Sequence, residues 1–97
     1  MRVVFSPEAR TEFDDAVQYY DHQRQGLGDE LRAEIRAFLP RLQRSPLTFP
    51  VERGDIRRLI LARFPYKLLY SVETDHIYVI ALAHRRRAPG YWVDRNV

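Results

Sequence analysis

Residues 84–92 read His-Arg-Arg-Arg-Ala-Pro-Gly-Tyr-Trp and directly follow an apolar run. Guanidinium groups present rigid forks of donors that match phosphate or carboxylate, and neighbouring aromatic rings can stack on bases or on a partner's side chains. These residue types therefore predict a site for an anionic ligand. The same pattern is equally typical of a solvated basic end whose Tyr91 and Trp92 pack back onto the core. Both interpretations stand at this point.

Basic residues gather in the second half of the chain, and acidic residues are more frequent in the first. The basic set there consists of Arg53, Arg57, Arg58, Arg63, Lys67, Arg85, Arg86, Arg87 and Arg95. Lys67 is the only lysine of the chain, whose formal net charge is +3. A basic half indicates an anionic partner, which is either nucleic acid or an acidic protein segment.

Length and composition exclude several classes of protein. A chain of 97 residues predicts a single domain, residues 1–97, around one core. No apolar run approaches the roughly 20 residues that span a bilayer, and the apolar start is too short for a signal peptide, so we expect a soluble cytoplasmic protein. There is no cysteine, the histidines lack metal-ligand spacing and the glycines form no phosphate-binding loop. We therefore expect no metal and no cofactor.

Two helices are predicted in the first half. Ser6 and Pro7 supply an N-cap and a first helical proline, and an apolar stripe continues at helical spacing to Tyr20. Glu8, Glu12 and Asp15 lie off that stripe, so we expect their carboxylates on the solvated surface. After a glycine-bearing break at residues 25–28, a second stripe runs over residues 27–42, and Pro40 should bend or divide it. The result is an antiparallel helical hairpin.

Strands are predicted at residues 2–5, 56–62, 66–73 and 77–83, where β-branched and apolar residues alternate. Residues 48–51 could pair briefly at an edge. The last three strands form a meander, which could bring Arg58, Arg63, Lys67 and Arg85 to one side of the sheet. We expect an α+β fold of two layers, in which the helical hairpin packs on a small antiparallel sheet in the order β-α-α-β-β-β.

That order of elements carries a family resemblance. Residues 64–70, Phe-Pro-Tyr-Lys-Leu-Leu-Tyr, and the ending at residues 84–92 resemble the RelE/ParE superfamily of bacterial toxins over nearly the whole chain. The resemblance implies the toxin of a type II toxin-antitoxin pair, which inhibits growth when free and is neutralised by a cognate antitoxin. It also implies that operator DNA is bound only through the antitoxin.

One branch of the superfamily, the RelE-like branch, cuts mRNA on the ribosome without a metal. By resemblance, Arg85 would stabilise phosphate charge and Tyr91 would stack on a base or transfer a proton. Lys67 stands where that branch usually carries arginine, and Arg58 matches a basic residue of the preceding strand. His84 is a possible replacement acid-base group, or a strand-end residue held by a backbone hydrogen bond.

Ile60 departs from the RelE-like pattern, because that branch carries a second strand lysine at this position. The ending at residues 89–92, Pro-Gly-Tyr-Trp, looks closer to ParE-like members, which poison DNA gyrase by binding and perform no chemistry. This mode is favoured over ribosome-dependent mRNA cleavage, and a non-toxic module that only binds a partner or nucleic acid is a third alternative. In the binding modes Arg63, Arg86, Arg87 and Trp92 would serve in docking or packing.

Overall fold

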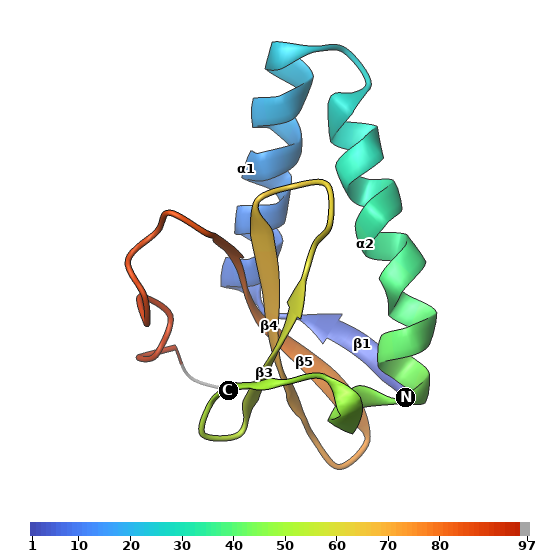
Figure 1. The fold of residues 1–97 in the computed structure, drawn as a ribbon, viewed down its shortest axis with the longest axis vertical. Coiled ribbons are helices and arrows are strands. Elements are labelled where there is room, and N and C mark those ends of the chain that lie inside the picture. The colour runs from blue at the N-terminus through green and yellow to red at the C-terminus, as the bar shows by residue number, and fades with distance from the viewer. Residues whose placement is uncertain (96–97) are drawn as a thin grey trace.

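The computed structural model describes residues 1–95 and shows two layers, a helical hairpin packed on one face of a five-stranded sheet (Figure 1). The predicted fold class is confirmed, and one short strand is added to the expected order. The elements are β1 (Arg2–Phe5), α1 (Pro7–Gln23), α2 (Leu27–Arg44), a 3-10 turn (Pro46–Thr48), β2 (Val51–Arg53), β3 (Ile56–Ile60), β4 (Tyr66–Val72) and β5 (His76–His84).

The sheet has the order β1-β5-β4-β3-β2 and is mixed. Strands β3 to β5 form the predicted antiparallel meander, and the added β2 also pairs antiparallel. Contrary to expectation, the sheet is not antiparallel throughout, because β1 pairs parallel with β5. A parallel pair needs a long connection, which the helical hairpin and the other three strands together supply. The direction of β1 could not be read from its own four residues, because it depends on which strand the chain later places beside it.

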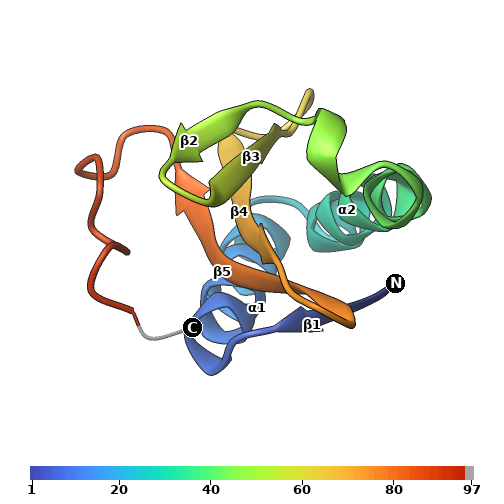
Figure 2. The ribbon, with the colours of Figure 1, turned by 90° about the horizontal axis from the view of Figure 1, so that it is seen from below.

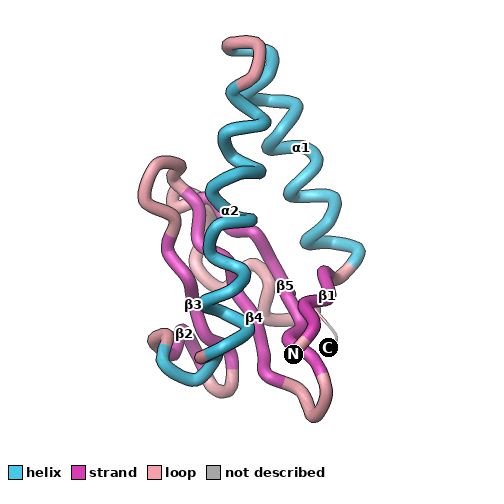
Figure 3. Tube along the Cα trace, turned by 90° about the vertical axis from the view of Figure 1, so that its right-hand side faces the viewer, coloured by secondary structure: helices cyan, strands magenta, loops and turns pink. Residues whose placement is uncertain are grey.

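Helix α1 starts as its sequence predicts. Ser6 is its N-cap, and the Ser6 hydroxyl accepts a hydrogen bond from the Ala9 amide at 3.0 Å. The same hydroxyl donates to the Ile80 carbonyl at 3.2 Å, so the cap also joins α1 to β5. Helix α2 is one continuous helix across Pro40, not two. Figure 3 shows both helices running side by side over the sheet.

The two helices approach each other closely at Gly28, at the start of α2. A Cβ atom there would lie 2.6 Å from the Val17 carbonyl oxygen and 2.8 Å from Asp21 Oδ1. The Gly28 amide donates to that Asp21 oxygen at 2.8 Å. Glycine is therefore required by space at this position, which sets the separation of the helices near the hairpin turn.

Both faces of the central strands are covered. The helices bury one face, where Leu68, Tyr70 and Leu82 join the main core. On the other face Leu69, Ile80, Ala81 and Ala83 pack under Trp92. Trp92 belongs to the C-terminal segment, residues 85–95, which lies on the side of the sheet away from α2 (Figure 2). This segment contains no helix or strand, yet it completes a second small core. Within residues 1–95 no helix is both long and apolar enough to cross a membrane.

Replacing the capping serine should weaken the fold measurably. We expect Ser6→Ala to lower the free energy of unfolding by about 1–2 kcal/mol, because the Ala9 amide loses its partner. Urea denaturation followed by circular dichroism measures this change. Ser45→Ala is the matched control, since Ser45 is exposed and makes no side-chain cap, and it should change stability by less than about 0.5 kcal/mol. Equal losses in the two variants would contradict the role given to Ser6.

Candidate functional site

A cleft of about 400 Å³ opens between the outer face of the sheet and the C-terminal segment. We call it the basic cleft. It unites four residues that the sequence analysis singled out from different parts of the chain, Arg58, Lys67, Arg85 and Tyr91. Its other lining residues are Glu52, Ile60, Ala83, His84, Arg87, Ala88, Pro89, Gly90 and Trp92.

The floor of the basic cleft follows from the register of the strands. Ile60 on β3 lies opposite Lys67 on β4, and Lys67 lies opposite Ala83 on β5. Arg58 is two residues before Ile60, so alternation along the strand puts both side chains on the same face. The sheet therefore carries two cations and an exposed isoleucine into the cleft, with 51% of Ile60 accessible to solvent.

The two cations of the floor, Arg58 and Lys67, form ion pairs with Glu52 from β2. Lys67 Nζ lies 2.5 Å from Glu52 Oε2, and Arg58 Nη1 lies 3.6 Å from Glu52 Oε1. Arg58 also donates to the Val51 carbonyl at 2.7 Å. Sequence reasoning missed Glu52, because a three-residue strand is too short to show alternation and the edge pairing was expected at residues 48–51 instead.

Tyr91 does not present a free hydroxyl to the basic cleft. Its phenol donates to Glu12 Oε2 at 2.6 Å, and the Arg87 guanidinium lies 3.8 Å from the centre of its ring. Burial, and then the bond to Glu12, raise the pKa of Tyr91 well above the ordinary value for tyrosine. The phenolate is thus strongly disfavoured at neutral pH, and Tyr91 is poorly suited to accept a proton.

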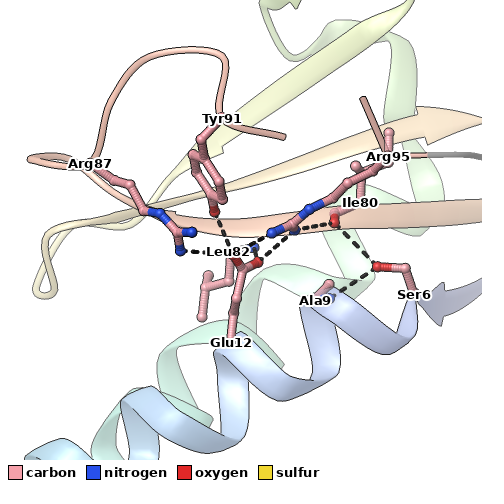
Figure 4. A network of polar contacts seen from close by, with 8 residues as sticks. All are labelled: Ser6, Ala9, Glu12, Ile80, Leu82, Arg87, Tyr91 and Arg95. Atoms are coloured by element: carbon pink, nitrogen blue, oxygen red, sulfur yellow. Dashed lines mark hydrogen bonds and ion pairs between the residues drawn. The ribbon is translucent and has the colours of Figure 1, made fainter. Parts of the chain in front are cut away.

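Glu12 holds the C-terminal segment to α1 and β5 (Figure 4). Besides the Tyr91 phenol, its carboxylate accepts the Leu82 amide at 3.1 Å, two Arg95 nitrogens at 3.0 and 2.9 Å, and the Arg87 guanidinium at 3.4 Å. The expectation of a solvated Glu12 was therefore wrong, since only 13% of this side chain is exposed. Its position on α1 is off the apolar stripe, but the distant C-terminal segment folds over it.

The electrostatics of Glu12 combine two opposing effects. Burial by itself raises the pKa of the Glu12 carboxyl, but hydrogen bonds from Arg95, Tyr91 and Leu82 outweigh it and leave that pKa below the ordinary value. The carboxylate is therefore charged near neutral pH. The same ion pair raises the pKa of Arg95. Charge-assisted bonds of this kind are the stronger class of hydrogen bond.

His84 and Arg85 play different parts at the end of β5. His84 Nδ1 accepts the Arg86 amide at 3.0 Å, which fits the strand-end role, and its ring meets the Tyr66 ring edge-on at 5.1 Å. Arg85 donates its backbone amide to the Pro65 carbonyl at 2.9 Å. The Arg85 side chain is exposed, lines the basic cleft and makes no hydrogen bond or ion pair within residues 1–95.

The remaining predicted residues do not all meet at this site. Arg63 does not converge with the cleft, because its guanidinium pairs with Glu30 at 2.5 Å and its amide donates to Glu34 at 3.1 Å, both on α2. Arg86 is exposed but is not part of the cleft lining. Trp92 reaches the cleft wall but is only 5% exposed, so it is mainly a packing residue.

Residues 3–89 match the model of the family described as the ParE toxin of the type II toxin-antitoxin system, parDE. The chain belongs to the ParE toxin family. It is thus the toxin of a type II system, and a cognate antitoxin is its partner. A solved structure described as the chromosomal ParDE TA system from P. aeruginosa shares the fold, with a TM-score of 0.75 and 18% identity over 87% of this chain and 95% of that one. No curated protein matches this toxin.

Loss of the Glu12 charge should loosen the C-terminal segment. We expect Glu12→Gln to lower the free energy of unfolding by about 2 kcal/mol, because the bonds to Arg95 lose their charged acceptor. Trp92 is the only tryptophan, so its fluorescence should shift to longer wavelength as this ring gains contact with water. Asp14→Asn, an exposed carboxylate on the same helix, is the control. An unchanged emission maximum in Glu12→Gln would contradict the anchoring role.

The stabilisation from Glu12 should also depend on pH. Its pKa is lower in the folded state than in the unfolded chain, so the folded protein binds the proton less readily. The contribution is therefore complete above about pH 4.3 and is lost as the pH falls from there through the folded-state pKa. The difference in unfolding free energy between the original protein and Glu12→Gln should narrow over this acidic range. Urea denaturation at a series of pH values measures it, and a constant difference down to pH values near 2 would exclude this linkage.

Proposed function

We propose that this toxin acts in the ParE-like mode, in which it poisons DNA gyrase by binding and performs no chemistry of its own. The observation that supports the proposal most is the pairing of the groups in the basic cleft. Lys67 and Arg58 face Glu52, and Tyr91 is bonded to Glu12. Groups that are paired with the protein's own carboxylates are less available to act on a substrate. They can still form part of a surface that binds another protein.

Cleavage of RNA without a metal requires more of the side chains in the cleft than binding does. It needs a group that exchanges protons near neutral pH and fixed cations directed at the phosphate. The raised pKa of Tyr91 opposes the first demand. The exposed Ile60 takes the place of one cation, and Glu52 offsets the charge of two others. A docking surface needs only shape and complementary charge, and these residues retain both.

Ribosome-dependent mRNA cleavage is the second candidate. It is favoured by the fact that Arg58, Lys67, Arg85, His84 and Tyr91 line a single cleft. In this mode Arg85 would stabilise the phosphate charge, because its guanidinium is exposed and makes no internal ion pair among the described residues. The two candidates differ in their need for the Tyr91 hydroxyl.

Tyr91→Phe distinguishes the two modes of action. This variant keeps the ring beside Arg87 and removes only the hydroxyl. We expect purified toxin to produce cleaved plasmid DNA with gyrase, and Tyr91→Phe to retain this activity within a fewfold. Primer extension on translated mRNA should show no cuts. Ribosome-dependent cuts that fall by about 10²-fold or more in Tyr91→Phe, together with intact plasmid in the gyrase assay, would overturn the proposal.

A further inference from the structure

Glu52 enters the basic cleft from an irregular edge strand. The pairing of β2 with β3 shifts register between Val51 and Arg53, so Glu52 stands at a bulge rather than within a regular ladder. Bulges of this kind turn a side chain away from its regular direction. Only 16% of the Glu52 side chain is exposed, although it lies on a three-residue strand at the sheet edge. Its carboxylate is instead enclosed in the cleft, where two cations contact it.

The carboxylate of Glu52 lies between two cations from neighbouring strands. One oxygen faces Lys67 Nζ at 2.5 Å, and the other faces Arg58 Nη1 at 3.6 Å. Both cations belong to longer strands of the sheet and keep 28% and 34% of their side chains exposed. Lys67 and Arg58 thus form a receptor spaced for the two oxygens of one carboxylate, and the chain's own glutamate occupies it.

The walls around this receptor favour a protein ligand over nucleic acid. Ile60, Ala83, Ala88 and Pro89 give the cleft apolar sides. Binding of single-stranded nucleic acid relies on aromatic faces open to the bases. Here Trp92 is buried and the face of Tyr91 is covered by Arg87. The cleft therefore combines a carboxylate receptor with apolar contacts, and its tryptophan and tyrosine rings are covered by the core and by Arg87.

We propose that the basic cleft binds an acidic protein segment, in which an aspartate or glutamate next to an apolar side chain takes the place of Glu52 between Arg58 and Lys67. Glu52 is then an internal competitor that keeps the receptor occupied when the partner is absent. Arg85, whose exposed guanidinium lines the same cleft, provides a further contact for the incoming segment. The inference goes beyond the mode of action proposed above and does not require gyrase as the partner.

Competition from Glu52 reduces the apparent affinity of any external carboxylate. If Glu52 occupied the receptor for about nine-tenths of the time, its removal would tighten binding about tenfold. Lys67 is the only lysine, so labelling with ¹⁵N-lysine places a single reporter ammonium at the receptor. The probe is the capped tripeptide acetyl-Leu-Asp-Leu-amide, and its Asn counterpart tests the need for charge.

We expect the aspartate peptide to shift the Lys67 signal at about tenfold lower concentration in Glu52→Gln than in the original protein. Glu52→Ala, which leaves no amide in the receptor, should behave in the same way. Asp55→Asn is the matched control, because it removes an exposed carboxylate three residues away and outside the cleft, and it should leave the titration unchanged. The Asn peptide should not shift the signal in any of these proteins.

Three results would overturn the proposal. The first is that Glu52→Gln, Glu52→Ala and Asp55→Asn all give the same titration. The second is that the Asp and Asn peptides shift the Lys67 signal equally. The third is that removal of Glu52 raises the affinity for a single-stranded oligonucleotide as much as the affinity for the aspartate peptide. The last result would assign the receptor to phosphate. These titrations use the toxin alone, so failure of the gyrase assay leaves their outcome unaffected.

Discussion

The Glu12 carboxylate is the contact on which the candidate site depends. It is one side chain on α1, yet it binds the backbone of β5 and three residues of the C-terminal segment. That segment has no regular secondary structure to hold it in place. Without Glu12, the C-terminal segment would keep the packing of Trp92 and the hydrogen bond from Arg95 to the Ile80 carbonyl, but would lose its bonds to α1. A network of charge-assisted hydrogen bonds holds this segment in place, as backbone hydrogen bonds between strands do in the rest of the sheet.

The half-buried carboxylates of Glu12 and Glu52 differ in how they are satisfied. Glu12 accepts bonds from a backbone amide, a phenol and guanidinium groups, so its removal leaves several donors without a partner. Glu52 faces only side-chain cations, and a carboxylate from another molecule can supply the same contacts. The first carboxylate is therefore structural. The second is replaceable. Glu12 thus holds the cleft together, whereas Glu52 occupies the position where we propose that a ligand binds.

Membership of the ParE family and the geometry of the cleft both support the proposal that this toxin acts by binding. The basic cleft brings Arg58, Lys67 and Tyr91 together, and each of them is paired with a carboxylate of the chain itself. A surface of this kind retains shape and partial positive charge, while the hydroxyl of its tyrosine is engaged by Glu12. A small toxin can thus keep the fold of the superfamily and act through recognition.

The sequence by itself determined what local pattern controls: the capped helix at Ser6, the two apolar stripes, the meander and the family resemblance at residues 64–70 and 84–92. Tertiary structure alone decided which distant groups meet. It made β1 parallel to β5, drew Arg63 to α2, and brought Glu12 within 2.6 Å of a tyrosine 79 positions later. Helical and strand periodicity indicate which residues face a core, but they cannot predict ion pairs between segments that are far apart in the chain. Residues 84–92, whose types predicted an anion site, therefore take their path from Arg87 and Tyr91 contacts with Glu12, which no local pattern connects to them.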